Sequence, residues 1–577
     1  MLIRRTWCWW TLLGLLLTTG CSQSEWDKVF KKEKDAQPEP SPRMVSKSQA
    51  TVGTIGELVT IDGLRLLQVR GFGLVVDLTN TGGGDAPEPV RQAIMKEIRR
   101  RQTTPEANVS PVDILKGRDI AIVEVSGLVP AAAEKGDTFD VVVRALGTQT
   151  TSLAGGRLYL CDLKPFAETI QAVLDAKTVA TAEGPLFISP IGLEKEIPTK
   201  IDLRKGLVLG GGKNTRPRTV RLVLNDPSPS NTRRIVDRLN GRYTKDDPLA
   251  KAKDAGSIEL IIPPEWRERK RVFLEQVLHT TLNPAPGVLE KRAKDLVTEI
   301  EHPDAEFESI GCAWEAIGRT VLPIIREVYN SPLPAASYFA GRTGLRLGDN
   351  AGMEVVGRHA LDPKSSYRQQ AIEELGYATN IHGAGEYLRK LLDDTDTPTR
   401  IRAYECLRRR VNSAIESKAL YEDKLALDTV DSNGPYMVYV KRSLAPRIAI
   451  FGKEMRCRPP VMYPADRRDD RFLHAQISAE ADADNLTVFC KNKHNGMTSP
   501  PLTVSLNVVE MLRFLGGAPT RDPDGALEGL ALPYDELVDI LYTFCQAKSI
   551  PAEFQAEDLT GSESSQEISQ ERKESEL

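Results

Sequence analysis

The residue types that most often carry out chemistry are sparse in this sequence, and their spacing forms no catalytic pattern. Its six histidines include no pair at i, i+4 spacing, the arrangement that places two imidazole ligands on one face of a helix. Neither a GxSxG nucleophile elbow nor an HExxH zinc motif occurs. We therefore predict that the protein is not an enzyme and has no catalytic residue, cofactor or metal site.

Two glycine-rich segments could be read as ligand-binding loops. A Walker phosphate loop at residues 209–215 would need glycine at position 207 and Ser or Thr after Lys213, where Leu207 and Asn214 stand. We interpret these glycines as turn residues with positive φ. Residues 82–85 (GGGD) lack a second cluster of carboxylates and are predicted to form a flexible connection.

Eight cysteines are spread widely along the chain, too far apart for a CxxC zinc site. Cys8 belongs to an N-terminal signal segment. An exported protein can oxidise its thiols, but six further cysteines in a chain this long do not make a disulfide scaffold. We expect most of these six to be buried apolar residues.

Cys21 is the candidate site of covalent modification. Arg4 and Arg5 precede an apolar run at residues 6–17, which is too short to span a bilayer comfortably, and Thr18, Thr19 and Gly20 then lead to Cys21. This pattern resembles the lipobox of bacterial lipoproteins, although Leu17 lies one position earlier than usual. We predict export and lipid attachment at Cys21. The alternative is an ordinary cleaved signal peptide with an incidental cysteine.

Composition places the rest of the chain among soluble multi-domain proteins. The 577 residues are 41% hydrophobic and 27% charged, which is ordinary globular usage and argues against wholesale disorder or a polytopic membrane protein. The formal net charge is −4, and basic residues are not interleaved with aromatic ones, so we predict no nucleic-acid partner.

Local patterns divide the chain into six segments with an α+β multi-domain fold. A polar, proline-containing stretch follows the signal peptide, and a Ser/Glu-rich stretch ends the chain. The predicted segments are a signal peptide (1–20), a disordered tether (21–50), mixed α/β domains (51–265), helical repeats (266–412), an α+β module (413–553) and a disordered acidic tail (554–577).

Hydrophobic periodicity predicts particular elements in the mixed and C-terminal segments. The predicted strands are residues 73–78, 120–125, 138–145, 219–224, 436–440, 447–451 and 486–490. The predicted helices are residues 89–101, 229–239, 508–515 and 534–547.

The helical segment shows a recurring Ile/Leu-Gly pair. Ile317-Gly318, Leu347-Gly348 and Leu375-Gly376 lie about 28–30 residues apart. Short helices that end at glycine favour HEAT-like repeats, each of which needs its neighbours to bury an apolar face. The alternative is an unrelated helical bundle in which this spacing is a coincidence.

Residues 55–84, IGELVTIDGLRLLQVRGFGLVVDLTNTGGG, resemble the start of the bacterial flagellar P-ring protein family. The positions that match the family pattern are Gly63, Arg65, Gly71, Gly73, Leu74, Val75, Leu78, Thr81 and Gly82. Further matches follow in the same order at residues 115–123, 136–143, 152–158 and 223–240. The resemblance covers about two-fifths of the chain, and the helical repeats stand where the family's C-terminal region is expected.

The resemblance implies a structural function. P-ring subunits form a periplasmic ring around the flagellar rod, at the level of the peptidoglycan, and act as a bushing for rotation. The implied partners are other copies of the chain, the rod, the L-ring protein and peptidoglycan, with the outer membrane added through Cys21. Gly71, Gly73, Gly155 and Gly156 fall within matching segments, and we expect them to be structural turn glycines.

Two alternatives to a flagellar ring subunit remain. One is an outer-membrane lipoprotein that uses a P-ring-like fold as a scaffold for another envelope assembly. The other is an exported hydrolase, for which the sequence offers no site.

Overall fold

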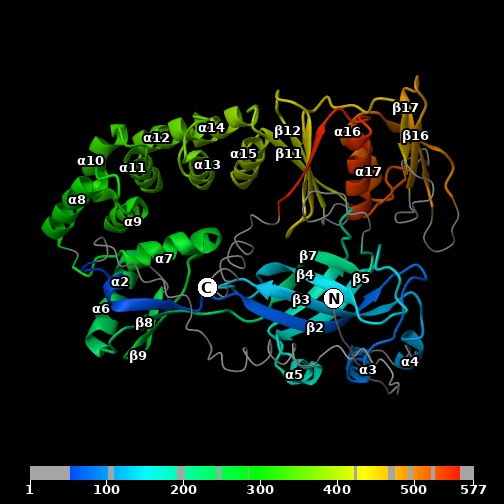
Figure 1. The fold of residues 1–577 in the computed structure, drawn as a ribbon, viewed down its shortest axis with the longest axis horizontal. Helices are drawn as coiled ribbons and strands as arrows, with labels where there is room; N and C mark the ends of the chain where they lie inside the picture. Colours follow the sequence, from blue (N-terminus) through cyan, green and yellow to red (C-terminus); the bar gives the residue numbers. More distant parts are fainter. Residues whose placement is uncertain are drawn as a thin grey trace, which may run out of the picture. The chain divides into compact units, whose positions relative to one another are not determined.

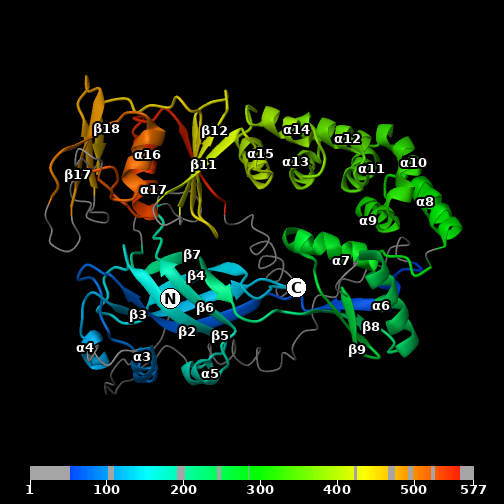
Figure 2. The same cartoon turned by 180° about the vertical axis from the view of Figure 1, so that it is seen from behind.

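The computed structural model describes residues 52–101, 110–190, 202–243, 248–283, 285–420, 425–464, 475–491, 498–521 and 527–558 (Figure 1). The predicted signal peptide, the tether, Cys21 and residues 559–577 lie outside these ranges. Helices and strands are mixed in several separately packed regions (Figure 2). The α+β multi-domain fold class is therefore confirmed.

Six antiparallel strands close into a barrel in the order β2-β3-β4-β7-β6-β5. Their bounds are β2 (Leu67–Val76), β3 (Ala121–Val129), β4 (Thr138–Ala145), β5 (Arg157–Pro165), β6 (Ala180–Pro185) and β7 (Lys205–Asn214). In β4, buried Phe139, Val141 and Val143 alternate with more exposed residues and point into the barrel core. The predicted strands at 73–78, 120–125 and 138–145 correspond to β2, β3 and β4.

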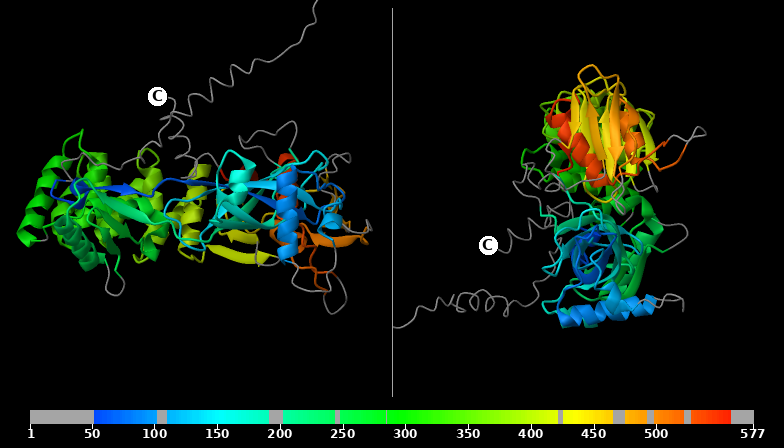
Figure 3. Two further views of the ribbon diagram at one scale, coloured as in Figure 1. Left: turned by 90° about the horizontal axis from the view of Figure 1, so that it is seen from below. Right: turned by 90° about the vertical axis from the view of Figure 1, so that its right-hand side faces the viewer.

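Three helices pack against the outside of the barrel: α3 (Glu88–Arg101), α4 (Pro111–Ile114) and α5 (Ile170–Asp175). Val90 and Ile94 of α3 contact Phe72 and Leu74, the outward-facing side chains of β2, in a small second core. Figure 3 shows the barrel nearly along its axis, with α3 on its outer side. The helix predicted at 89–101 is confirmed.

A four-stranded antiparallel sheet has the order β1-β8-β10-β9. Its strands come immediately before and after the barrel strands in the sequence. Its strands are β1 (Val59–Asp62), β8 (Val220–Leu224), β9 (Ala250–Asp254) and β10 (Ser257–Leu260). Because β1 precedes the barrel and pairs with β8, which follows it, the barrel is an insertion between two neighbouring strands of this sheet.

One face of this sheet is covered by α2 (Ile55–Leu58), α6 (Pro229–Tyr243) and α7 (Lys270–Leu278), with the 3₁₀ helix η2 (Pro264–Arg269) leading into α7. Phe273, Leu274 and Val277 of α7 are completely buried in this core. Residues 266–278 were predicted to belong to the helical repeats, whereas the apolar face of α7 packs on the sheet.

The helical region continues from α8 to α15, and its helices pack on others nearby in the chain (Figure 1). The helices are α8 (Pro286–Ile300), α9 (Phe307–Ile317), α10 (Leu322–Ile325), α11 (Pro334–Arg346), α12 (Asn350–Leu361), α13 (Arg368–Tyr377), α14 (Ala384–Leu391) and α15 (Thr397–Arg409). Short 3₁₀ helices η3 (Arg319–Val321) and η4 (Arg326–Asn330) flank α10.

The three recurring glycines have different structural roles. Gly318 and Gly348 follow the ends of α9 and α11 with φ of 95° and 85°. Gly376 lies inside α13, where an added β-carbon would be 2.6 Å from the Sγ atom of Cys406. Two glycines thus end helices, and the third lets two helices approach closely. The assignment to HEAT-like repeats stays a prediction.

The C-terminal module contains two sheets. A five-stranded sheet has the order β11-β12-β14-β13-β19, and a four-stranded antiparallel sheet has the order β15-β16-β17-β18. The strands are β11 (Ile415–Leu420), β12 (Leu425–Val430), β13 (Met437–Lys441), β14 (Arg447–Phe451), β15 (Val461–Tyr463), β16 (Ala475–Ala479), β17 (Asn485–Cys490), β18 (Leu502–Ser505) and β19 (Glu553–Ala556).

Helices α16 (Val508–Gly516) and α17 (Tyr534–Gln546) lie between these two sheets and share one apolar core with both (Figures 1 and 2). The strands and helices predicted for this part of the chain are present. The tail was predicted from residue 554, whereas residues 553–556 form β19 and pair in parallel with β13.

Candidate functional site

Gly71 and Gly73 were predicted to be turn glycines, and this prediction is wrong. Both lie within β2, and neither has a positive φ. An added β-carbon at Gly71 would lie 2.3 Å from the carbonyl oxygen of Asp162, and one at Gly73 would lie 2.9 Å from the β-carbon of Cys161. The glycines are required because β2 lies unusually close to its paired neighbour β5 in the barrel wall, where their pairing register also shifts.

Gly155 and Gly156 lie at the entrance to β5. Gly155 has a φ of 66°, which favours glycine. At Gly156 an added β-carbon would lie 2.6 Å from Cγ1 of Val75, inside the barrel core. These glycines, like those of β2, shape the barrel and bring no reactive group together.

The glycines of the run at 209–215 were predicted to be turn residues, but residues up to 214 belong to β7 and only Gly210 of its three glycines has a positive φ, at 59°. This run contacts the C-terminal module. The Asp140 carboxylate in β4 accepts hydrogen bonds from the backbone N–H groups of Gly210 at 2.6 Å and Leu444 at 2.8 Å. Phe187 packs against Tyr534 of α17, with ring centroids 5.2 Å apart. Burial raises the pKa of Asp140, although the two hydrogen bonds oppose this shift. Asp140 therefore links the barrel to the module.

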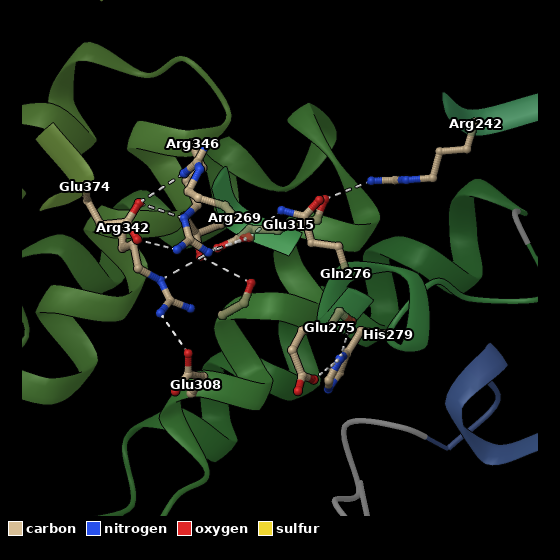
Figure 4. A network of polar contacts seen from close by, with 12 residues as sticks. Arg242, Arg269, Glu275, Gln276, His279, Glu308, Glu315, Arg342, Arg346 and Glu374 are labelled. Atoms are coloured by element: carbon tan, nitrogen blue, oxygen red, sulfur yellow. Dashed lines mark hydrogen bonds and ion pairs between the residues drawn. The ribbon is translucent and has the colours of Figure 1, made fainter. Parts of the chain in front are cut away.

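A second contact joins the sheet region to the helical region through a buried polar network (Figure 4). The side chain of Glu315 in α9 is 0% exposed. Its carboxylate accepts hydrogen bonds from Gln276 of α7 at 2.7 Å and from Arg346 of α11 at 3.0 Å. Arg242 of α6 donates to the backbone carbonyl of Glu315 at 2.9 Å. One residue of α9 thus bonds to three other helices.

Arg346 extends this network to α13. Its Nε donates to Glu374 at 2.9 Å, while its Nη1 stays on Glu315. Arg269, at the end of η2, lies 3.6 Å from the Glu374 carboxylate, and Arg342 lies 3.7 Å from that of Glu315. Glu308 pairs with Arg342 at the more exposed rim, so the ion pairs join Arg269, Arg342 and Arg346 to Glu308, Glu315 and Glu374.

Electrostatic pairing favours the ionised forms of Arg346 and Glu374. Burial acts to lower the pKa of Arg346, but the carboxylates of Glu315 and Glu374 raise it well above its ordinary value. Burial acts to raise the pKa of Glu374, but the Arg346 guanidinium, the largest opposing influence, holds it below its ordinary value. A buried charge is tolerated only when it is paired and hydrogen-bonded in this way.

Arginine–aromatic contacts lie next to this polar network, and together they form the junction between the sheet region and the helical region. Arg269 lies over the ring of Tyr377, 4.4 Å from its centroid, and Arg409 lies over the same ring at 4.1 Å. Arg409 also pairs with Glu268 of η2 at 2.9 Å. These contacts hold the segment before α7 against α13 and α15.

This arrangement positions helices and offers no reactive group. The carboxylates and guanidiniums of the network bind one another, and His279 is buried with its ring nitrogens on the Glu275 carbonyl at 2.8 Å and the Ser309 hydroxyl at 3.1 Å. Among the described residues, no group of three His, Cys, Asp or Glu side chains is placed to hold a metal ion.

Most cysteine thiols of the described ranges are shielded from solvent. Cys161, Cys312, Cys406 and Cys457 are buried, as predicted for most of the six. Burial raises the pKa of Cys312 to about 12, which keeps it protonated and unreactive at neutral pH. No helix in the described residues has the length and apolar character needed to cross a membrane.

None of the network residues was predicted from the sequence. The available signal was Glu315, which stands inside an otherwise apolar helix (residues 310–317, IGCAWEAI) and therefore needed a buried partner. Arg342 and Arg346 at i, i+4 spacing on α11 were the matching signal.

The described residues between 52 and 283 thus contain a closed six-stranded barrel inserted between two neighbouring strands of a four-stranded sheet. Residues 54–296 match the family model described as flagellar P-ring protein. This match confirms the P-ring-like region inferred from the sequence. It runs past residue 265, through α7 and into α8, in agreement with the packing of α7 on the sheet.

Individual relatives show the same similarity. The chain is 26% identical over 293 residues to the flagellar P-ring protein of Syntrophotalea carbinolica, covering 48% of this chain and 74% of the relative. It is 30% identical to those of Nitrosospira multiformis and Nitrosomonas europaea, covering 40% and 41% of this chain and 60% and 62% of the relatives. The chain thus spans about three-fifths to three-quarters of these relatives, and the similarity covers its N-terminal half at most.

Proposed function

We propose that this protein is a structural subunit of a periplasmic ring around the bacterial flagellar rod, where it serves as a bushing for rotation and supports motility. The observation that carries the proposal is the match of residues 54–296 to the P-ring family, collinear through the barrel and the sheet that frames it. The proposal makes the protein non-enzymatic, which suits a site whose ionisable groups bind each other.

Ring formation sets the partners. A closed ring requires a heterologous interface, in which one face of each subunit binds a different face of the next copy. The implied partners are therefore other copies of the chain and the rod, together with the L-ring protein and peptidoglycan, at the flagellar basal body in the periplasm.

Cys21 supplies the proposed outer-membrane anchor. Two or more acyl chains, at about 0.8 kcal/mol per buried CH₂, hold a protein stably on a membrane. Cys21→Ala should lose acyl labelling and leave the membrane fraction, whereas Cys8→Ala should change neither. A wild-type chain without a lipid label, and a variant that stays in the membrane fraction, would contradict the anchor.

The helical region and the C-terminal module are proposed to form an additional collar on the ring. The buried Glu315 network and the Asp140 contact support this, because they bind both additions to the matching region. Deletion of residues 286–550, which keeps α7 in its core, should leave a thinner ring provided that the remaining protein folds.

The experiment that tests the flagellar assignment is deletion of the gene, with swimming measured in soft agar. The deletion strain should swim poorly or not at all, and the intact gene supplied in trans should restore swimming. Full motility of the deletion strain would favour the alternative, a lipoprotein scaffold for another envelope assembly that uses the same fold.

A further inference from the structure

Two cysteines of the C-terminal module, Cys457 and Cys545, belong to the same apolar core. Cys457, which precedes β15, is 3% exposed, and Cys545, in the last turn of α17, is half-buried and packs against that core. The Sγ atom of Cys457 lies 4.0 Å from the Sδ atom of Met511 in α16. The two thiols thus enter one core from parts of the chain that are far apart in the sequence.

Backbone hydrogen bonds bring these two parts of the chain together. The N–H group of Arg458 donates to the carbonyl of Ser549 at 2.6 Å. The chain turns back on the end of α17 there, because the N–H group of Ile550 donates to the carbonyl of Phe544 at 3.0 Å. Each cysteine is one residue, a step of about 3.8 Å, from this connection. A disulfide needs Cα atoms about 4.4–6.8 Å apart, a separation that such a connection allows.

The two thiols also lie within electrostatic reach of each other. Burial, followed by the charge of the neighbouring Cys457 thiolate, raises the pKa of Cys545 to about 12. The thiols of Cys312, Cys406 and Cys490 instead have charged arginine or glutamate side chains as their main electrostatic neighbours. Geometry and electrostatics therefore single out Cys457 and Cys545 as a pair.

A bond between the two cysteines would close a large part of the module into a loop. Residues 457–545 contain the sheet β15-β16-β17-β18, α16 and nearly all of α17. Joining the ends of a loop this long restricts the unfolded chain much more than the folded one, so the bond stabilises the folded state.

We propose that Cys457 and Cys545 form an intramolecular disulfide bond when the chain folds in an oxidising compartment. This inference rests on the export that is part of the proposed function, because structural disulfides form and persist outside the cytosol. It does not rest on the flagellar assignment, since both cysteines lie outside residues 54–296.

The oxidant is the disulfide of a thiol–disulfide oxidoreductase. The thiolate of Cys545, the more exposed cysteine, attacks one sulfur of that disulfide and forms a mixed disulfide, while the second sulfur leaves as a thiolate. The Cys457 thiolate then attacks the Cys545 sulfur and releases the oxidoreductase. Two electrons pass to the oxidoreductase, whose two sulfurs take up the two thiol protons and become a dithiol.

The order of these steps follows from burial. Burial raises the pKa of Cys457 to about 12, as it does for Cys545, so the folded core holds very little of either thiolate at neutral pH. Both exchange steps therefore take place while the module folds, before the core closes.

The test is to map the cysteines of the full chain isolated from the cells that produce it. The protein is unfolded in the presence of N-ethylmaleimide, which alkylates free thiols, and is digested and analysed by mass spectrometry with and without dithiothreitol. Cys545→Ala removes one partner, and Cys312→Ala is the matched control at a buried cysteine of the helical region. Reduced wild type is also refolded with glutathione disulfide, which tests the pair without export.

The proposal predicts a cross-linked peptide pair containing Cys457 and Cys545 in wild type, which dithiothreitol separates. Cys545→Ala should lose the cross-link and gain an alkylated Cys457, whereas Cys312→Ala should keep it. Reduction should lower the thermal unfolding midpoint of wild type by about 5–10 °C and leave that of Cys545→Ala unchanged.

Alkylated Cys457 and Cys545 in both the isolated and the refolded wild type overturn the proposal, and so does a cross-link from either residue to a different cysteine. A cross-link that forms on refolding but is absent from the protein isolated from cells supports the pair and contradicts the export. The swimming of the deletion strain tests the flagellar assignment separately.

Discussion

The barrel and the junction around Glu315 are held together by opposite means. The barrel core consists mainly of small and branched apolar side chains that fill the space between six strands, with glycines where β2 packs closely against β5. The junction places ionised groups from η2, α9, α11 and α13, and the neutral Gln276 of α7, in a buried site where each of these charges has a partner. The barrel depends on shape, whereas the junction depends on a complete set of charges.

This difference predicts how the two regions fail. A packed apolar core loses stability in proportion to the volume removed or added, and neighbouring residues absorb part of the change. A buried ionic network fails more abruptly, because deleting one member leaves its partners charged and unpaired. The junction should therefore be the more sensitive of the two to single substitutions, and it should fix how the helical region attaches to the P-ring-like region.

The largest expected effect is at Glu315. Glu315→Ala leaves Arg346 and Arg342 without their shared buried partner, and the free energy of unfolding should fall by about 3–5 kcal/mol, as measured by urea denaturation. The double variant Glu315→Met/Arg346→Met replaces charges by apolar groups of similar size and should recover part of the loss. If the single and double variants are equally destabilised, pairing of the charges is not what stabilises the junction.

The next-largest loss of stability is expected for Gly71→Val in the barrel. In Gly71→Val the added atoms meet the carbonyl oxygen of Asp162 and the Sγ atom of Cys161, so the variant should lose about 1–3 kcal/mol of stability. Gly241→Ala in α6 is the matched control, because an added β-carbon there has no atom within 4 Å. A Gly71→Val variant as stable as wild type would show that β2 and β5 separate without cost.

The stability of the junction should also depend on pH through the Glu374 carboxylate, unlike the stability of the apolar barrel core. Arg346 holds the pKa of Glu374 in the folded protein below its ordinary value. Glu374 therefore contributes its full stabilisation at any pH above the ordinary pKa, and this stabilisation is lost as the pH falls through the lowered pKa of the folded state. Wild type should therefore lose unfolding free energy more steeply than Glu374→Gln on acidification below about pH 4.5. Equal slopes for the two proteins would show that Glu374 is not paired in the folded state.

The smallest effect is expected at Gly241 itself. Gly241→Ala replaces glycine inside an exposed turn of α6 with the best helix former, and it should stabilise the protein by about 0.5–1 kcal/mol. Differential scanning calorimetry should show a slightly higher unfolding midpoint. A lower midpoint would mean that the backbone at this position needs the freedom of glycine.

The sequence predicts the local elements better than their packing. The strands at 120–125 and 138–145 and the helix at 89–101 follow from apolar periodicity, which is a local property. The packing of α7 does not follow from apolar periodicity, because its amphipathic pattern fits a repeat helix and a sheet-covering helix equally well. Gly71 was recognised as necessary, but its reason, contact with β5 about 90 residues later in the chain, is a tertiary property that spacing does not contain.

The candidate site shows the same division. The absence of catalytic motifs and the P-ring resemblance are readable from the residues, whereas the pairing of Glu315 with Arg346 depends on which helices meet. Buried charges of this kind become visible only when the partners are brought together by the fold.

Electron cryomicroscopy of purified basal bodies from wild type and from a strain lacking this gene tests the central claim most directly. The account predicts a ring around the rod in the wild type whose subunits accommodate the barrel and its framing sheet, and basal bodies without that ring in the deletion strain. A complete, unchanged set of rings in the deletion strain would contradict it.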